Sequence, residues 1–215
     1  MAQSGIGLGH KLLAEFVGSA FLVIATISPT ILAYNVIQAE TMLAVLSDAL
    51  AVAFVLFALI EMLGSVSGCH INPAVTLSML LTKKIDPKTA IAYIGVQIPG
   101  GILGTICSHL MFYQINPILL TISTVERPCG CYFAEFLGTF LLLATIYGCT
   151  QNNSKLASLS IALLVELFNL AVRVNPLDVA RILVAVIGDI EITVRAKLEL
   201  PTVVVVLGGM RQTDD

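Results

Sequence analysis

The sequence has 215 residues, of which 57% are hydrophobic and 12% are charged, against roughly 25% charged residues in soluble domains. This composition excludes an ordinary soluble protein and predicts an integral membrane protein. The net charge of −3 comes without a basic block or interleaved aromatic residues, so nucleic acid is not expected as a partner. The five cysteines are scattered, apart from Cys129 and Cys131, and fit neither a disulfide framework nor a metal site.

Five apolar runs follow one another along the chain, each with at most two charged residues, and they cover 12–34, 42–63, 89–113, 128–150 and 156–172. Because about 20 apolar residues cross a bilayer, the first four runs are long enough and the fifth is just adequate. The first run is too long for the core of a signal peptide. The sequence therefore predicts five transmembrane helices of a multi-pass protein.

The basic residues between these runs indicate the orientation, because Lys and Arg are retained on the cytoplasmic side. Most of them precede the first run, follow the second or precede the fifth, and they are Lys11, Lys83, Lys84, Lys88 and Lys155. Segments 35–41 and 114–127 contain only Arg127. If segment 67–82 dips into the membrane and returns, the basic loops share one side. We therefore expect a cytoplasmic N-terminus in the cell membrane.

An internal repeat relates the two halves of the chain. The sequence AEFVGSAFLV at 14–23 aligns without gaps to AEFLGTFLLL at 134–143, and Asn72-Pro73 has a later counterpart in Asn175-Pro176. Three spans per half, an odd number, place the halves in opposite orientations, as in many transporters and channels. We expect a single domain over 1–215, with repeat one at about 11–113 and repeat two at about 128–210.

The stretch SGCHINPAVTL, at 67–77, interrupts an apolar region with polar residues. Asn is a preferred helix N-cap and Pro is favoured at the first helical position, so Asn72-Pro73 predicts a helix from Ala74 to about Leu81. This helix is too short to span. A helix that begins at membrane depth needs its backbone buried in protein or facing water. The interruption therefore predicts a re-entrant half-helix beside a wet cavity.

Two half-helices of opposite orientation would meet near the midplane of the membrane. Each would offer a positive N-terminal end and an Asn amide donor, which repels cations and can donate hydrogen bonds to a neutral solute. A single Asn-Pro pair is more typical of a kink or of a cap at the membrane surface. Two pairs, each placed after the same repeated segment, favour the half-helices.

The stretch SGCHINPAVTL resembles the first signature loop of the aquaporin, or major intrinsic protein, family. Glu15 and Glu135 in the repeated segments resemble the family's glutamates of the first and fourth helices. Part of the third helix is also similar, through Gln97, Gly100, Gly101 and Gly104. The resemblance covers the chain from about residue 11 to 177.

The resemblance implies an all-α fold of six transmembrane helices and two half-helices, usually a homotetramer with one pore per subunit. It implies passage of water or small uncharged solutes across the lipid bilayer, with no cofactor and no catalysis. Glu15 and Glu135 would support the loops, and His70 would either line the vestibule or support its turn. The pore motifs would be Asn72, Pro73 and Ala74, then Asn175, Pro176 and Leu177.

The second half departs from the family pattern. Only 40 residues separate Glu135 from Asn175, whereas 57 separate Glu15 from Asn72. Leu177 replaces a small residue, and Asp178 stands where many members have Arg. Asp178 is read equally as a pore residue or as a partner of the helix dipole. Arg181, one turn later, resembles an arrangement in some bacterial members.

The expected outer filter contains Val52, Asp178 and Asn169, with Leu163 as the alternative to Asn169. These residues predict a mouth wide enough for glycerol, urea, ammonia, peroxide or neutral metalloid acids beside water. The expected sixth helix is short, because its uncharged core at 201–210 has ten residues, too few to cross a bilayer of roughly 30 Å. We interpret this sixth helix as truncated, degenerate or completed by neighbouring subunits.

Two other classes of function remain open at this point. A non-conducting structural or junctional membrane protein on the same fold would suit Leu177, Asp178 and the short sixth helix. A membrane enzyme is a poorer interpretation. Glu61, Cys69 and His70 are close in sequence, but no second base, metal set or nucleotide loop accompanies them.

Overall fold

The computed structural model describes residues 5–115, 117, 119–120 and 129–173, with 129–131 and 167–173 described by their backbone alone. Every regular element in these residues is helical. The elements are α1 (Leu8–Ile31), the π-helix η1 (Leu32–Ile37), α2 (Thr41–Leu63), α3 (Pro73–Leu81), α4 (Pro87–Met111), α5 (Cys129–Gln151) and α6 (Ala157–Arg173). The second Asn-Pro motif, Asp178, Arg181 and the expected sixth helix lie outside the described residues.

All five predicted apolar runs are helices, but four rather than five are long and apolar enough to cross a membrane within the described residues. These four cover Leu8–Ile37, Thr41–Leu63, Pro87–Met111 and Tyr132–Gln151. The fifth helix, α6, has 17 residues, and its described apolar part is the shorter segment Ala157–Glu166.

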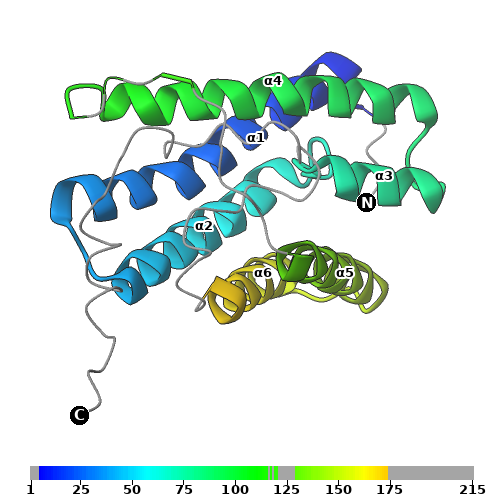
Figure 1. Ribbon diagram of the computed structural model, residues 1–215. Coiled ribbons are helices and arrows are strands. Elements are labelled where there is room, and N and C mark those ends of the chain that lie inside the picture. The colour runs from blue at the N-terminus through cyan, green and yellow to red at the C-terminus, as the bar shows by residue number, and fades with distance from the viewer. Residues whose placement is uncertain (1–4, 116, 118, 121–128, 174–215) are drawn as a thin grey trace, which may run out of the picture.

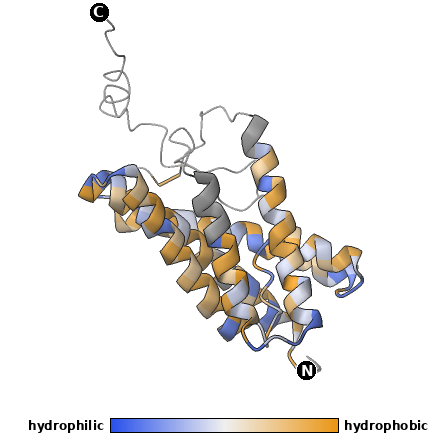
Figure 2. Cartoon of the chain, turned by 90° about the horizontal axis from the view of Figure 1, so that it is seen from below, coloured by the Kyte–Doolittle hydropathy of each residue, from blue (hydrophilic) through white to orange (hydrophobic). Residues whose placement is uncertain are grey.

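Figure 1 shows α1 and α4 running side by side, with α2 beside α1 and with α5 and α6 forming a pair. Helix α2 also packs against α6, so α2 and α6 join the first three long helices to the last two. The hydropathy view shows apolar residues along the lengths of the helices and polar residues mainly near their ends (Figure 2). This distribution is the one expected of helices whose sides face lipid or each other.

Helices α1 and α4 approach each other closely because two glycines face the backbone of α1. A Cβ added at Gly100 would lie 2.4 Å from the carbonyl oxygen of Phe16, and one added at Gly104 would lie 2.4 Å from that of Ala20. Small residues at helix interfaces in membranes let the backbones meet, so that van der Waals contact can hold the helices together. The glycine face of α4 therefore places α4 against the part of α1 that carries Glu15.

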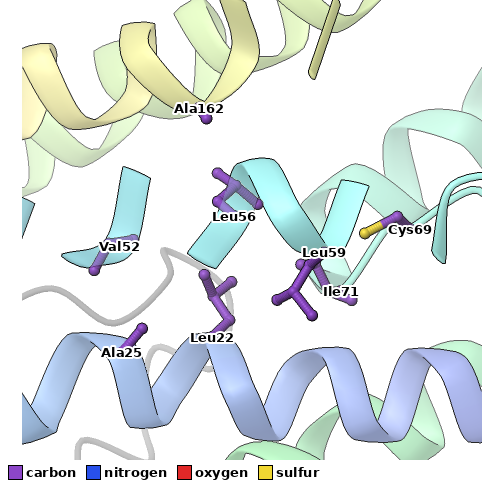
Figure 3. Close-up of a cluster of buried hydrophobic side chains, with 8 residues drawn as sticks. All are labelled: Leu22, Ala25, Val52, Leu56, Leu59, Cys69, Ile71 and Ala162. Carbon is purple, nitrogen blue, oxygen red and sulfur yellow. The ribbon is translucent and has the colours of Figure 1, made fainter. Parts of the chain in front are cut away.

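An apolar cluster lies where α1, α2 and α6 meet (Figure 3). Helix α2 contributes the centre of this cluster, and α6 contributes Ala162, which is 1% exposed. The loop before α3 adds two residues, which connects the cluster to the re-entrant segment. Its members are Leu22, Ala25, Val52, Leu56, Leu59, Cys69, Ile71 and Ala162.

The half-helix α3 ends in a tight turn that has a lysine at the position usually taken by glycine. The N–H of Lys83 donates to the carbonyl of Leu80 at 3.0 Å, and the N–H of Lys84 donates to that of Met79 at 2.8 Å. These two bonds form a Schellman motif, in which the first residue after the helix C-cap takes a left-handed conformation. Lys83 takes that conformation with φ 58°. The turn therefore stores backbone strain that glycine would not have.

Replacing Lys83 with glycine is expected to stabilise the folded protein by about 0.5–1 kcal/mol, because glycine adopts positive φ without the Cβ penalty. Thermal unfolding in detergent, followed by circular dichroism, should show a higher midpoint. Lys88, in the first turn of α4, is not among the residues with positive φ, and Lys88→Gly should not raise the midpoint. An unchanged or lower midpoint for Lys83→Gly would show that the left-handed turn carries no strain.

Candidate functional site

The re-entrant half-helix begins as the Asn-Pro pair predicts, with α3 spanning Pro73–Leu81. Asn72 is extended, with φ −151° and ψ 120°, and its Oδ1 accepts a hydrogen bond from the N–H of Ala74 at 2.8 Å. Pro73 follows at the first helical position, where no N–H is needed. Since Oδ1 is used for capping, the carboxamide of Asn72 offers its NH2 group, a donor, to the surroundings.

The loop that leads to Asn72 is anchored on the carboxylate of Glu15, which is fully buried in α1. Oε1 accepts hydrogen bonds from Ser67 Oγ at 2.6 Å and from the N–H of His70 at 2.9 Å. Oε2 accepts from the N–H of Ile71 at 2.6 Å and from Gln97 Nε2 at 2.8 Å. Four donors thus compensate one buried acid, which would otherwise be costly inside a membrane.

These bonds also fix where the loop carbonyls point. The N–H of Cys69 donates to Ser67 Oγ at 3.0 Å, so three successive N–H groups, those of residues 69–71, turn toward the Glu15 side of the loop. In a trans peptide the carbonyl points opposite to the N–H of the next residue, and the described chain has no cis peptide bonds. The carbonyls of Gly68, Cys69 and His70 therefore face away from Glu15, as a row of acceptors that leads to Asn72.

The same loop holds strained backbone. Gly68, Cys69 and Ile71 have φ values of 94°, 49° and 38°. A left-handed conformation costs roughly 1–2 kcal/mol for a residue other than glycine, and such strain persists only where the surroundings hold it in place. The hydrogen bonds to Glu15 supply this restraint. Ile71 also fills the space beside Gly18 of α1, where an added Cβ would lie 2.5 Å from Ile71 Cγ2.

Helix α4 adds a second layer of support that the sequence analysis did not assign. The hydroxyl of Tyr93 donates to the carbonyl of Ser67 at 2.9 Å, and Gln97 Nε2 also donates to Thr76 Oγ1 at 3.1 Å. Tyr93 and Gln97 are four residues apart, hence on one helix face, in a run without charged residues. That spacing of two polar side chains was the available signal for an interior face.

His70 is half-buried at the turn before Asn72. Its Nδ1 lies 3.2 Å from Thr76 Oγ1, and its ring meets the ring of Tyr93 edge-on at 5.3 Å between centroids. These contacts hold the imidazole between α3 and α4. Its backbone N–H donates to Glu15, and its carbonyl belongs to the row of acceptors. His70 therefore makes the contacts expected of a residue that supports the turn, and its role in lining the vestibule stays a prediction.

The remaining predicted residues lie elsewhere. Val52 is buried in the cluster between α1, α2 and α6 (Figure 3), so its role in a filter stays a prediction. Glu135 is half-buried on α5 and takes part in an interaction within the protein. Asn169 lies on the backbone-only part of α6, and its alternative Leu163 is 43% exposed. The structure therefore assembles the first half of the predicted site.

The fold and the site define a class of helical membrane protein in which a half-helix begins at membrane depth on a loop held by a buried acid. The family model described as "Major intrinsic protein" matches residues 4–182. The chain therefore belongs to the major intrinsic protein family.

Relatives within this family are of moderate similarity. The chain is 32% identical over 139 residues to "Aquaglyceroporin AqpS" of Rhizobium meliloti, covering 65% of this chain and 58% of that protein. It is 31% identical over 166 residues to "Aquaporin AqpM" of Methanothermobacter thermautotrophicus, covering 66% of each. The chain spans less than two thirds of the length of AqpS.

The fold is also similar to that of a solved structure, the aquaglyceroporin from Plasmodium falciparum. The TM-score is 0.62 at 21% sequence identity, with coverage of 80% of this chain and 74% of that one. At this identity the match supports the aquaporin fold.

Proposed function

We propose that this chain forms a passive transmembrane channel for water and small uncharged solutes, without a cofactor and without catalysis. The observation that carries the proposal is the row of polar groups formed by the loop and the start of the half-helix. The carbonyls of residues 68–70 face away from Glu15, and the next polar side chain along the chain is that of Asn72, whose NH2 lies at the positive end of α3. A neutral molecule that both donates and accepts hydrogen bonds can exchange water contacts for these groups.

The second half of the channel is part of the same proposal. Asn175 and Pro176 would cap a second half-helix of opposite orientation, with Leu177 at the point where the two half-helices cross. The repeated glutamates support this arrangement, with Glu135 as the counterpart of Glu15. The domain would then span 1–215, with repeats at about 11–113 and 128–210.

The solute range follows from the proposed outer filter. Val52, Asn169 and Asp178 would form a mouth without the usual Arg, with Arg181 one turn further along. Such a mouth would admit glycerol, urea or other small neutral molecules beside water. The names of two relatives, an aquaglyceroporin and an aquaporin, support both kinds of solute.

The setting of the channel is proposed from the sequence and the family. The chain would lie in the cell membrane with its N-terminus in the cytoplasm, because the basic loops then share the cytoplasmic side. A homotetramer with one pore per subunit is the assembly that the family implies. Cross-linking in the membrane would test this assembly.

Asn72→Asp tests the central donor. Aspartate is also a good N-cap, so α3 should stay folded, but the NH2 donor is lost and an anion is placed beside the path. We expect water flux into proteoliposomes, measured by stopped-flow light scattering, to fall about tenfold or more, which is a barrier increase of about 1.4 kcal/mol. Glycerol flux in the same vesicles should fall as well.

The control for this experiment is the same substitution at an exposed asparagine. Asn152 lies in the exposed turn after α5, and Asn152→Asp should conduct like the wild-type protein. Wild-type flux equal to that of bare lipid, in vesicles that contain folded protein, would contradict the proposed function and favour the structural protein. Full flux through Asn72→Asp would show that the Asn72 donor does not take part in permeation.

A further inference from the structure

One side chain of the second half reaches across to the far end of the first half-helix. Tyr147, on α5, has its hydroxyl oxygen 2.7 Å from Ser78 Oγ and 3.0 Å from Thr82 Oγ1. Its hydroxyl is also 3.8 Å from Met79 Sδ. These three partners belong to the last turn of α3 and its cap. Sequence separations of 65 to 69 residues make this a contact between the two predicted repeats.

One arrangement of the protons joins the three hydroxyls, although either oxygen of the Ser78–Tyr147 and Tyr147–Thr82 pairs can be the donor. In this arrangement Thr82 Oγ1 donates its single proton to the carbonyl of Ser78 at 2.8 Å, so it is left to accept from Tyr147. The hydroxyl of Tyr147, having donated to Thr82, accepts from Ser78. The result is a continuous chain of donors from Ser78 to Tyr147 to Thr82, which returns to the backbone of Ser78. The hydrogen bonds within such a chain strengthen one another in a low dielectric.

The ring of Tyr147 holds the next residues as well. Lys84 Nζ lies 4.2 Å from the centroid of the ring, within the range of a cation–π interaction. Lys84 follows directly on the left-handed Lys83 and supplies the closing N–H of the Schellman turn. Tyr147 therefore contacts both sides of the strained turn. Its hydroxyl forms hydrogen bonds with the last turn of α3 and its cap, and the face of its ring contacts Lys84, the residue after Lys83.

We infer that Tyr147 is a positioning residue for the channel, which fixes the tilt and depth of the half-helix α3 from the opposite repeat. This inference rests on the proposed function. The nine residues of α3 extend about 13.5 Å at 1.5 Å per residue. One end is held by Asn72 and the loop on Glu15, and Tyr147 holds the other. A half-helix released at one end can tilt about the other, which displaces the groups that line the path.

The test replaces Tyr147 with phenylalanine, which removes the hydroxyl and keeps the ring under Lys84. Tyr132→Phe is the matched control, because Tyr132 lies on the same helix and is 62% exposed. Hydrogen–deuterium exchange of the full chain in lipid nanodiscs should quicken about fivefold at the amides of residues 82–84, the effect of a net loss of about 1 kcal/mol when the hydrogen bonds of the hydroxyl are removed. The ratio of glycerol to water permeability in proteoliposomes should change about twofold or more.

A double-substitution cycle separates a specific contact from a general loss of stability. In a Ser78→Ala, Met79→Leu, Thr82→Val background, Tyr147→Phe should have no further effect on exchange or on the permeability ratio, because the three partners of its hydroxyl are gone. Lys84→Met, which keeps the length of the side chain without its charge, should quicken exchange at the same amides through loss of the cation–π contact.

The outcomes distinguish the inference from the proposed function. Unchanged exchange at residues 82–84 in Tyr147→Phe would overturn the inference whether or not the wild-type protein conducts. Faster exchange with an unchanged permeability ratio in a conducting protein would overturn it too. A wild-type protein that conducts no water would contradict the proposed function, and the exchange result would still decide whether Tyr147 holds α3.

Discussion

Glu15→Gln is expected to disable the channel and to cause the largest loss of stability of any conservative substitution in the first repeat. Each oxygen of the carboxylate accepts two hydrogen bonds. Glutamine has one oxygen and one NH2 group, so in either orientation two of the four donors face another donor. A buried donor without its acceptor costs about 1–3 kcal/mol. The loss should therefore be about 2–6 kcal/mol of unfolding free energy.

The functional loss in Glu15→Gln follows from the same bonds. Ser67, His70 and Ile71 lose part of the restraint that keeps their loop in its left-handed conformation. The row of carbonyls then turns away from its fixed direction. We expect water flux per folded protein to fall about tenfold or more, since a barrier increase of about 1.4 kcal/mol is sufficient. Stopped-flow measurements and thermal unfolding on the same preparation would check both effects.

Glu40→Gln is the matched control, because Glu40 is exposed before α2 and its side chain makes no capping hydrogen bond. The same chemical change there should leave the unfolding midpoint and the flux as they are in the wild-type protein. If Glu15→Gln behaves like Glu40→Gln, the loop does not depend on the carboxylate, and the direction assigned to the carbonyls loses its basis.

The parts of the fold that could be predicted are those that depend on residues close together in the sequence. The apolar runs predicted every long helix to within a few residues, because hydropathy over about 20 residues determines what a bilayer accepts. The half-helix was predicted from two adjacent residues, Asn72 and Pro73, whose capping preferences act over a single turn. The structure confirms α3 at Pro73–Leu81.

The parts that could not be predicted depend on partners far apart in the chain. Gln97 donates to Glu15 across 82 residues, and Tyr147 meets Ser78 across 69. No local pattern says which polar side chain of one helix will meet which loop of another. The Schellman turn could not be predicted from the sequence for a different reason. Its left-handed position holds Lys83 instead of glycine, so the usual sequence signal for that turn is missing.

The packing of α6 could not be predicted from its composition. The run at 156–172 is helical as predicted, and Glu166 within it is 5% exposed. A buried acid inside a membrane helix marks a face turned toward the protein. The apolar cluster with Ala162 shows the same orientation. Helix α6 packs against α2 and α5.

Gly100→Ala is expected to separate the two helices that build the site. The added Cβ would lie 2.4 Å from the carbonyl oxygen of Phe16, a backbone atom that cannot rotate away. Ordinary contact distances of about 3.5 Å require the helices to move apart by about 1 Å. Overpacking of this kind costs about 1–3 kcal/mol. Phe16 adjoins Glu15, so the 2.8 Å bond between Glu15 and Gln97 would be stretched beyond hydrogen-bonding distance.

Gly95→Ala gives the opposite expectation on the same helix. Gly95 is exposed, and an added Cβ there meets no atom within 4 Å. Alanine should therefore stabilise the helix by about 0.5–1 kcal/mol through its better helix propensity. Unfolding midpoints of the two variants should move in opposite directions from the wild-type value, and only Gly100→Ala should lose water flux. If both variants are stabilised, α1 and α4 are not in backbone contact at Gly100, and the close approach is not what brings Gln97 to Glu15.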